Sequence, residues 1–190
     1  HASCRHTHPA ADALLKAMQD NDLTIDDIGS VTALVHQAAI DVLGPVTAPA
    51  SVHQAKFSMG TTLGLIAAHG RAGMSEFQNG FDSPEIAAFR ACVVMRLDDE
   101  VNAAYPARWI GKVALETRDG RHIEARVDEP KGDPGNTLSR EEIDAKVRGL
   151  AAFSRAADAA EMDVVLPRLW TIERANHIGA LMPARGAGLS

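Results

Sequence analysis

With 190 residues, 46% of them hydrophobic and 23% charged, the chain can bury a substantial core, as one domain or as one domain plus part of another. The net charge of −6 and the lack of a Lys/Arg run argue against general binding to nucleic acids or anionic membranes. The chain has only two cysteines and no apolar run near the roughly 20 residues of a membrane helix, so we expect a soluble, cytoplasmic protein.

The N-terminal pattern predicts a helix followed by a strand. Thr7 can cap a helix that begins near Pro9, because proline at the first helical position loses no needed hydrogen bond. Residues 30–40 then alternate between apolar and polar side chains, as in a strand. The two prolines of "GPVTAPA" end that strand.

Two further helices are predicted before residue 94. Ser51 can cap a helix over residues 52–70, in which Gly60 and Gly64 leave a face where another backbone can approach closely. The stretch "DSPEIAAFRACV" predicts another helix over residues 82–93, with a polar cap and a proline in its first turn.

The clearest β-structure is a hairpin over residues 109–127. Two alternating segments flank an Asp119-Gly120 turn, which is typical of an antiparallel hairpin. The stretch "DEPKGDPGNTLSREE" then breaks the composition with two prolines and two glycines.

The remainder of the chain reads as helical. Ser139 followed by Glu142 forms a capping box, and a second helical segment over about residues 156–181 is expected to be interrupted at Pro167. The final "RGAGLS" is expected to fray. The predicted fold class is therefore α+β: a small domain with an antiparallel sheet and packed helices, followed by a helical C-terminal tail.

The opening "HASCRHTHPAAD" has three possible interpretations. Cys4, His6 and His8 would share one face of an extended segment and could bind zinc, but a second Cys/His cluster to complete four ligands is missing. The residues could also be a helix cap and polar side chains at a chain end. Alternatively, a helix N-terminus together with Arg5 would favour a substrate carboxylate. Local chemistry does not rank these alternatives.

Three stretches resemble the C-terminal part of the MmgE/PrpD family in order and spacing: "ASCRHTHPAAD", "QAKFSMGTTLGL" and "EPKGDPGNTLSREEIDAKVRGLA". The third is the most specific. The resemblance implies a lid domain over residues 1–133. It also implies a helical segment over residues 134–190, which returns to an N-terminal helical domain absent from this chain.

The family includes 2-methylcitrate dehydratase, cis-aconitate decarboxylase and iminodisuccinate epimerase, whose substrates are small di- or tricarboxylic acids. The resemblance implies a lyase without metal or organic cofactor, and a homodimer with its active site between lid and helical domain. Dehydration of a 2-methylcitrate-like acid is the favoured reaction, with decarboxylation and epimerisation left open. A non-catalytic assembly or dimerisation module is the alternative when the chain stands alone.

Carried over residue by residue, the resemblance implies six site residues: the catalytic Cys4, His8 and Lys56, and the substrate-binding Arg5, Ser58 and Thr61. Cys4 stands where decarboxylase-like members have an active-site histidine, and Thr61 stands where many members have a tyrosine. These departures leave the exact reaction open. Each residue also has a structural interpretation, such as a solvated surface lysine for Lys56 or a hydrogen bond within its own helix for Ser58.

Overall fold

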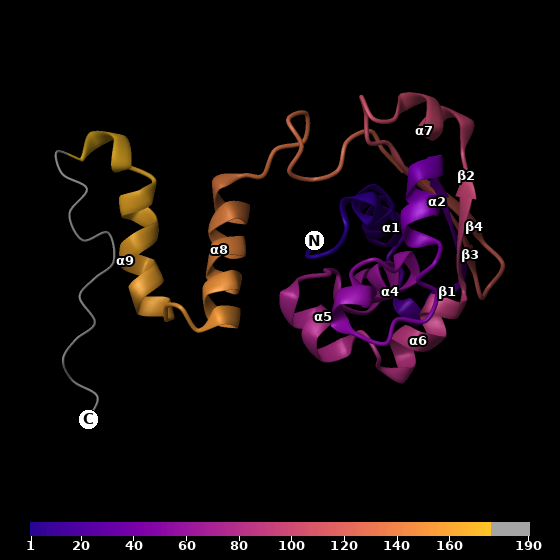
Figure 1. Cartoon of the computed structure of the whole chain (residues 1–190), viewed down its shortest axis with the longest axis horizontal. Coiled ribbons are helices and arrows are strands. Elements are labelled where there is room, and N and C mark those ends of the chain that lie inside the picture. Colours follow the sequence, from indigo (N-terminus) through magenta and orange to yellow (C-terminus); the bar gives the residue numbers. More distant parts are fainter. Residues whose placement is uncertain (176–190) are drawn as a thin grey trace. The chain divides into compact units, whose positions relative to one another are not determined.

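The structure, a computed structural model, describes residues 1–175 and divides the chain into two compact units, His1–Thr137 and Leu138–Ser190 (Figure 1). The first unit combines a four-stranded sheet with helices. The described part of the second unit is helical. The predicted α+β class is therefore confirmed. Within residues 1–175, no helix has both the length and the apolar character that a membrane span requires.

The sheet has the strand order β2-β1-β3-β4 and is mixed. Its strands are β1 (Ile28–Val35), β2 (Val93–Leu97), β3 (Gly111–Thr117) and β4 (His122–Val127). The β3–β4 pair confirms the predicted hairpin, and β1 also pairs antiparallel with β3. The predicted antiparallel pairing holds for β1, β3 and β4, whereas the edge strand β2 pairs parallel with β1. Val93, which we assigned to a helix, begins this edge strand.

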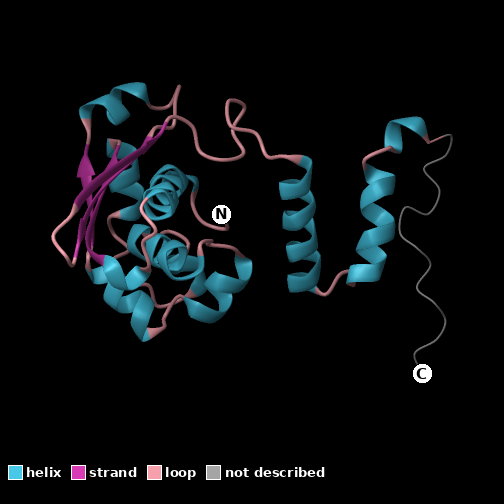
Figure 2. Cartoon of the chain, turned by 180° about the vertical axis from the view of Figure 1, so that it is seen from behind, coloured by secondary structure: helices cyan, strands magenta, loops and turns pink. Residues whose placement is uncertain are grey.

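Helices pack against one face of the sheet, as Figure 2 shows. The helix α1 (His8–Asp20) lies across β3 and β4, and it buries Ala10, Ala11 and Leu14. Along β4, exposed side chains alternate with half-buried ones, as expected when only one face of a strand is covered. The N-terminus of α1 is thereby held by the sheet.

Two segments differ from the predictions because side chains start new helices. The strand predicted over residues 30–40 ends at Val35, since the His36 ring accepts a hydrogen bond from the N–H of Ala39 and caps α2 (Gln37–Leu43). The single helix predicted over residues 52–70 is divided into α3 (Val52–Ala55) and α4 (Met59–His69). Ser51 caps the former as predicted, and Ser58 caps the latter.

The predicted close approach at two glycines is confirmed between α4 and α6 (Pro84–Ala91). A Cβ added at Gly60 would lie 2.6 Å from the Cγ of Arg90, and one at Gly64 would lie 3.2 Å from a methyl carbon of Ile86. Side chains at these two positions would push the helices apart. The helix α5 (Met74–Gly80) also packs against α4.

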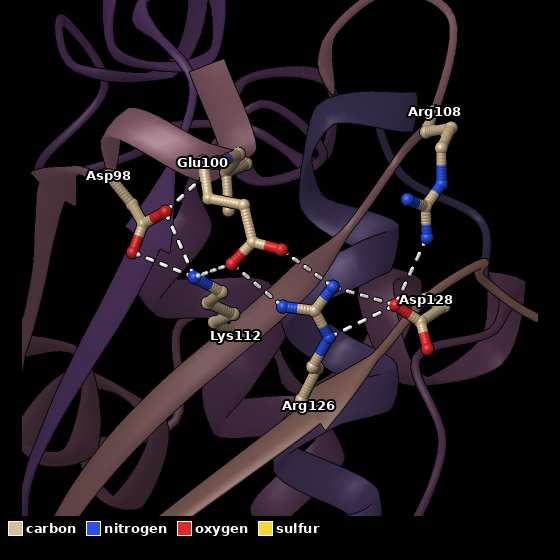
Figure 3. A network of polar contacts seen from close by, with 7 residues as sticks. Asp98, Glu100, Arg108, Lys112, Arg126 and Asp128 are labelled. Carbon is tan, nitrogen blue, oxygen red and sulfur yellow. Dashed lines mark hydrogen bonds and ion pairs between the residues drawn. The ribbon is translucent and has the colours of Figure 1, made fainter. Parts of the chain in front are cut away.

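An ion-pair network ties α7 (Asp99–Ala104) to the sheet (Figure 3). The Nζ atom of Lys112 on β3 lies 3.1 Å from Asp98 and 2.6 Å from Glu100. Arg126 on β4 contacts Glu100 and Asp128. Hydrogen bonds from Arg126 and Lys112 lower the pKa of Glu100 to about 2. The network therefore keeps its charges at neutral pH and fixes the start of α7.

The second unit contains α8 (Arg140–Ser154) and α9 (Ala159–Leu169), which pack together. The predicted capping box of Ser139 and Glu142 is confirmed. The predicted interruption of the helical segment at Pro167 falls two residues later, because α9 includes Pro167 and ends at Leu169. Residues 176–181 of the predicted helical segment and the final "RGAGLS" lie outside the described residues.

Candidate active site

The structure brings the first two motifs side by side. The backbone N–H of Cys4 donates to the carbonyl oxygen of Lys56 at 2.8 Å. Two residues earlier, the N–H of Ala2 donates to the carbonyl oxygen of Ala72, also at 2.8 Å. The opening segment is therefore bonded to the chain on both sides of α4, at Lys56 before it and at Ala72 after it, and all of these residues lie in the first unit.

The opening segment is not extended, so the premise of the zinc alternative was wrong. Residues Arg5–Thr7 form a 3-10 turn before α1, and the Thr7 hydroxyl donates to the carbonyl oxygen of Cys4 instead of capping α1. This turn sends His6 towards His36, while His8 contacts the carbonyl oxygen of Ser3. Among residues 1–175, no group of three or more His, Cys, Asp or Glu side chains is placed to hold a metal ion.

His8 begins α1 and has a defined basic atom. Burial lowers the pKa of His8, and the nearby His1 lowers it further, so the ring is neutral at pH 7. Its Nε2 atom lies 3.2 Å from the carbonyl oxygen of Ser3, which can only accept a hydrogen bond. The proton therefore resides on Nε2 and the lone pair on Nδ1. The predicted catalytic residue has an imidazole nitrogen able to accept a proton.

Lys56 lies at the break between α3 and α4 and is half-buried, which differs from a fully solvated surface lysine. Its Nζ atom donates to the thioether sulfur of Met74 at 3.4 Å. A thioether is a weak acceptor and carries no charge. No described carboxylate forms an ion pair with Lys56 in the first unit, so its positive charge is available to an anionic ligand.

Arg5, by contrast, already has an anionic partner. Its Nη2 atom lies 2.6 and 2.5 Å from the two carboxylate oxygens of Asp133. Its guanidinium also lies over the ring of Trp109, with 4.7 Å between the guanidinium carbon and the ring centroid. Any substrate carboxylate at Arg5 would share the guanidinium with Asp133.

The hydroxyl groups of Ser58 and Thr61 lie in the packed interior. The two residues are 1% and 0% exposed. Ser58 accepts a hydrogen bond from the Thr61 N–H and another from the Thr61 hydroxyl at 3.1 Å, and Arg90 donates to the Thr61 hydroxyl at 3.3 Å. These contacts begin α4 and join it to α6. The substrate-binding role of both residues stays a prediction.

A cluster of aromatic rings beside Arg5, formed by His6, His36, Tyr105 and Trp109, was not predicted from the sequence. His36 is 4% exposed and stacks on Tyr105 with 3.8 Å between ring centroids. Because its Nδ1 accepts from Ala39, its Nε2 carries the proton and donates to Nδ1 of His6 at 3.3 Å. Burial, and then repulsion from His6, lower the pKa of His36 to about 4. The one sequence signal for His36 is its position between β1 and α2, where a polar side chain can cap the helix.

Because His36 is buried and neutral in this ring cluster, we expect the free energy of unfolding to fall as the pH is lowered. An unfolded histidine has a pKa of about 6.5, so as the pH falls from 6.5 towards 4 the unfolded chain binds a proton at His36 that the folded chain does not. His36 should therefore remove about 2 to 3 kcal/mol of unfolding free energy across that window, with no further loss below pH 4. Urea unfolding at pH 7.5 and 4.5 measures this difference.

The control is His36→Asn, which keeps a helix-capping side chain but cannot titrate in this range. It should unfold with a weaker dependence on pH between 7.5 and 4.5 than the wild-type chain. Equal pH dependence of the two proteins would contradict the assignment of His36 as a buried neutral ring.

The model of the MmgE/PrpD C-terminal domain matches residues 1–172. This span contains all six predicted site residues and the loop that carries Asp133. A search of curated proteins found no match.

Proposed function

The chain belongs to the MmgE/PrpD family, and from this we propose that it forms the C-terminal part of a lyase that needs no cofactor. Its substrate would be a small di- or tricarboxylic acid, from which a proton beside a carboxylate is removed. The observation that supports this proposal most directly is the hydrogen bond from the Cys4 N–H to the Lys56 carbonyl oxygen, because it joins the backbone that carries Arg5 and leads into α1 to the residue whose ammonium group has no described anionic partner. Carboxylate binding needs such N–H donors and cations.

The proposed chemistry follows from the charges of these groups. Lys56 and Arg5 would hold substrate carboxylates and stabilise the negative charge that develops when the neighbouring carbon loses its proton. The Nδ1 atom of His8 would accept that proton. In a dehydration, the hydroxyl group then leaves with a second proton as water and a carbon–carbon double bond forms. Cys4 is proposed as the carrier of the second proton because it adjoins Lys56.

Residues 1–133 are proposed as a lid and residues 134–190 as the segment that docks on an N-terminal helical domain. The second unit supports this division, because several of its apolar side chains are exposed to between 38 and 45%: Leu150, Phe153, Val164, Leu169 and Ile172. Such side chains gain free energy when another protein surface covers them. A homodimer is part of the same proposal.

The test uses the protein in which this chain is joined to a helical domain of the family. Each of several acids (2-methylcitrate, citrate, cis-aconitate, iminodisuccinate) is incubated in D2O, and deuterium uptake is followed by NMR. Exchange at a carbon beside a carboxylate is expected for at least one acid. The product then separates dehydration, decarboxylation and epimerisation. Absence of exchange and of turnover for all of them would contradict the proposal.

The same exposed side chains favour a second candidate, an assembly role for the chain alone. In that case the 190-residue chain would bind a helical-domain polypeptide or itself without catalysing exchange. Sedimentation of the chain with and without that polypeptide, combined with the D2O assay, separates the two candidates. Turnover by the isolated chain would exclude the assembly role as its sole function.

A further inference from the structure

The most specific stretch of the sequence contains none of the predicted site residues. Residues 131–136, here called the KGDPGN loop, connect the sheet to the second unit and contact the opening segment through Asp133. We propose that Asp133 is a positioning residue, which holds the guanidinium of Arg5 in one orientation, and that the loop is built to present it. The inference rests on the proposed function in one respect, the binding of a substrate carboxylate by Arg5.

Two contacts fix the guanidinium of Arg5. Both carboxylate oxygens of Asp133 accept from the same nitrogen, Nη2, and the flat face of the group lies on Trp109. In the described part of the chain, the Nε and Nη1 atoms of Arg5 make no hydrogen bond. Asp133 therefore orients the group while leaving N–H donors for a planar carboxylate.

Hydrogen bonds within the loop hold the backbone around Asp133. Gly132 has a φ of +98°, and its N–H donates to the carbonyl oxygen of Asn136 at 2.8 Å. The N–H of Asn136 donates back to the carbonyl oxygen of Asp133 at 2.9 Å. The Gly135 N–H donates to the Glu129 carboxylate at 2.7 Å, and a Cβ at Gly135 would lie 2.2 Å from that carboxylate. The positive φ favours glycine at position 132, and the Asn136 side chain adds a hydrogen bond from its Nδ2 atom to the carbonyl oxygen of Glu129 at 3.0 Å.

A second attachment holds the loop against α1. The backbone N–H of Lys131 donates to one carboxylate oxygen of Asp12 at 2.6 Å, and His1 lies 2.7 Å from the other. The His1 ring contacts the edge of the His8 ring, with 5.2 Å between centroids. The loop is thus bonded to the opening segment at Arg5 and to α1 at Asp12. A shift of the loop would therefore move the guanidinium of Arg5 and, through Asp12 and His1, the imidazole of His8.

If Asp133 orients Arg5, its loss should affect kcat and KM differently from the loss of a residue that only supports the fold. An arginine without a partner would attract any anion more strongly, because Asp133 offsets its charge. What Asp133 adds is orientation, which matters most for the reacting geometry. Asp133→Asn should therefore leave the attraction for the substrate in place and slow the chemical step. Arg5→Ala should instead weaken substrate binding.

The kinetic test uses the protein that contains both domains and the acid it turns over. Asp133→Asn should lower kcat about tenfold or more while KM stays within about threefold, whereas Arg5→Ala should raise KM. Asp133→Glu should recover part of kcat because it restores the carboxylate. In the Arg5→Ala background, Asp133→Asn should cause no further loss of kcat/KM. A full additional loss in that background would overturn the inference.

A second readout does not depend on turnover. In the 190-residue chain, the Nη2 protons of Arg5, which are bonded to Asp133, should exchange slowly with water by NMR and exchange rapidly in Asp133→Asn. Asp128→Asn is the matched control, since it removes a carboxylate from two exposed arginines, and it should leave Arg5 unchanged. An equally protected Arg5 in Asp133→Asn, or general unfolding of that variant, would overturn the inference. If no acid is ever turned over, the proposed function fails while this measurement still decides the role of Asp133.

Discussion

Gly111→Ala should lower the free energy of unfolding of the first unit by about 3 kcal/mol or more. Gly111 begins β3 directly beneath the start of α1. A Cβ at this position would lie 2.0 Å from the carbonyl oxygen of Pro9 and 2.8 Å from a methyl carbon of Val127. The nearest atoms belong to backbone, so no side-chain rotation can make room. Either the helix or the strand must shift, and urea unfolding followed by circular dichroism measures the cost.

The matched control is Gly80→Ala in the same unit. A Cβ at Gly80 would meet only side-chain atoms at 3.7 and 3.8 Å, which are ordinary contact distances. This variant should stay within about 0.5 kcal/mol of the wild type. If Gly111→Ala unfolds at the same urea concentration as Gly80→Ala, the close packing of α1 on β3 is not as described. The comparison also bears on the site, because the shifted backbone adjoins His8.

The elements that the sequence predicted correctly are those with local signals. Alternation on both sides of Asp119-Gly120 defines the hairpin, and serine side chains mark the starts of α3, α6 and α8. The errors fall where tertiary contacts decide between helix and strand. Val93 continues an apolar helical pattern, yet pairing with Val31 makes it the start of β2. His36 continues the alternation of β1, yet its ring caps α2.

In the candidate site, too, local features could be predicted from the sequence, whereas contacts between distant residues could not. The resemblance supplied Cys4 and Lys56, but only the folded chain shows that their backbones are bonded to each other. The partner of Arg5 is 128 residues away, a pairing that no local pattern can indicate. Ser58 shows the opposite case, since its capping role can be inferred from a polar residue before an apolar helix. Sequence reasoning thus found the chemical groups, and the fold determined which of them lie together.

Lys56→Ala, made in the protein that contains both domains, should raise KM by roughly 30- to 150-fold, the equivalent of about 2 to 3 kcal/mol of substrate binding. The reason is electrostatic. The ammonium group contacts only the uncharged sulfur of Met74 among its described hydrogen-bond partners. Removing the ammonium group should change the free energy of unfolding little. The loss should therefore appear in the free energy of binding of the substrate carboxylate. Steady-state kinetics over a range of substrate concentrations measures the change.

Lys16→Ala provides the control, because Lys16 is an exposed lysine whose ion pair with Asp20 lies within α1. It removes the same charge from the same unit and should leave KM within about twofold, since exposed charges are screened by water and salt. Lys56→Arg restores the charge with a different shape and should recover part of the binding. A general loss of positive charge would affect both alanine variants equally. An unchanged KM in Lys56→Ala would place the carboxylate-binding cations elsewhere and remove Lys56 from the proposed site.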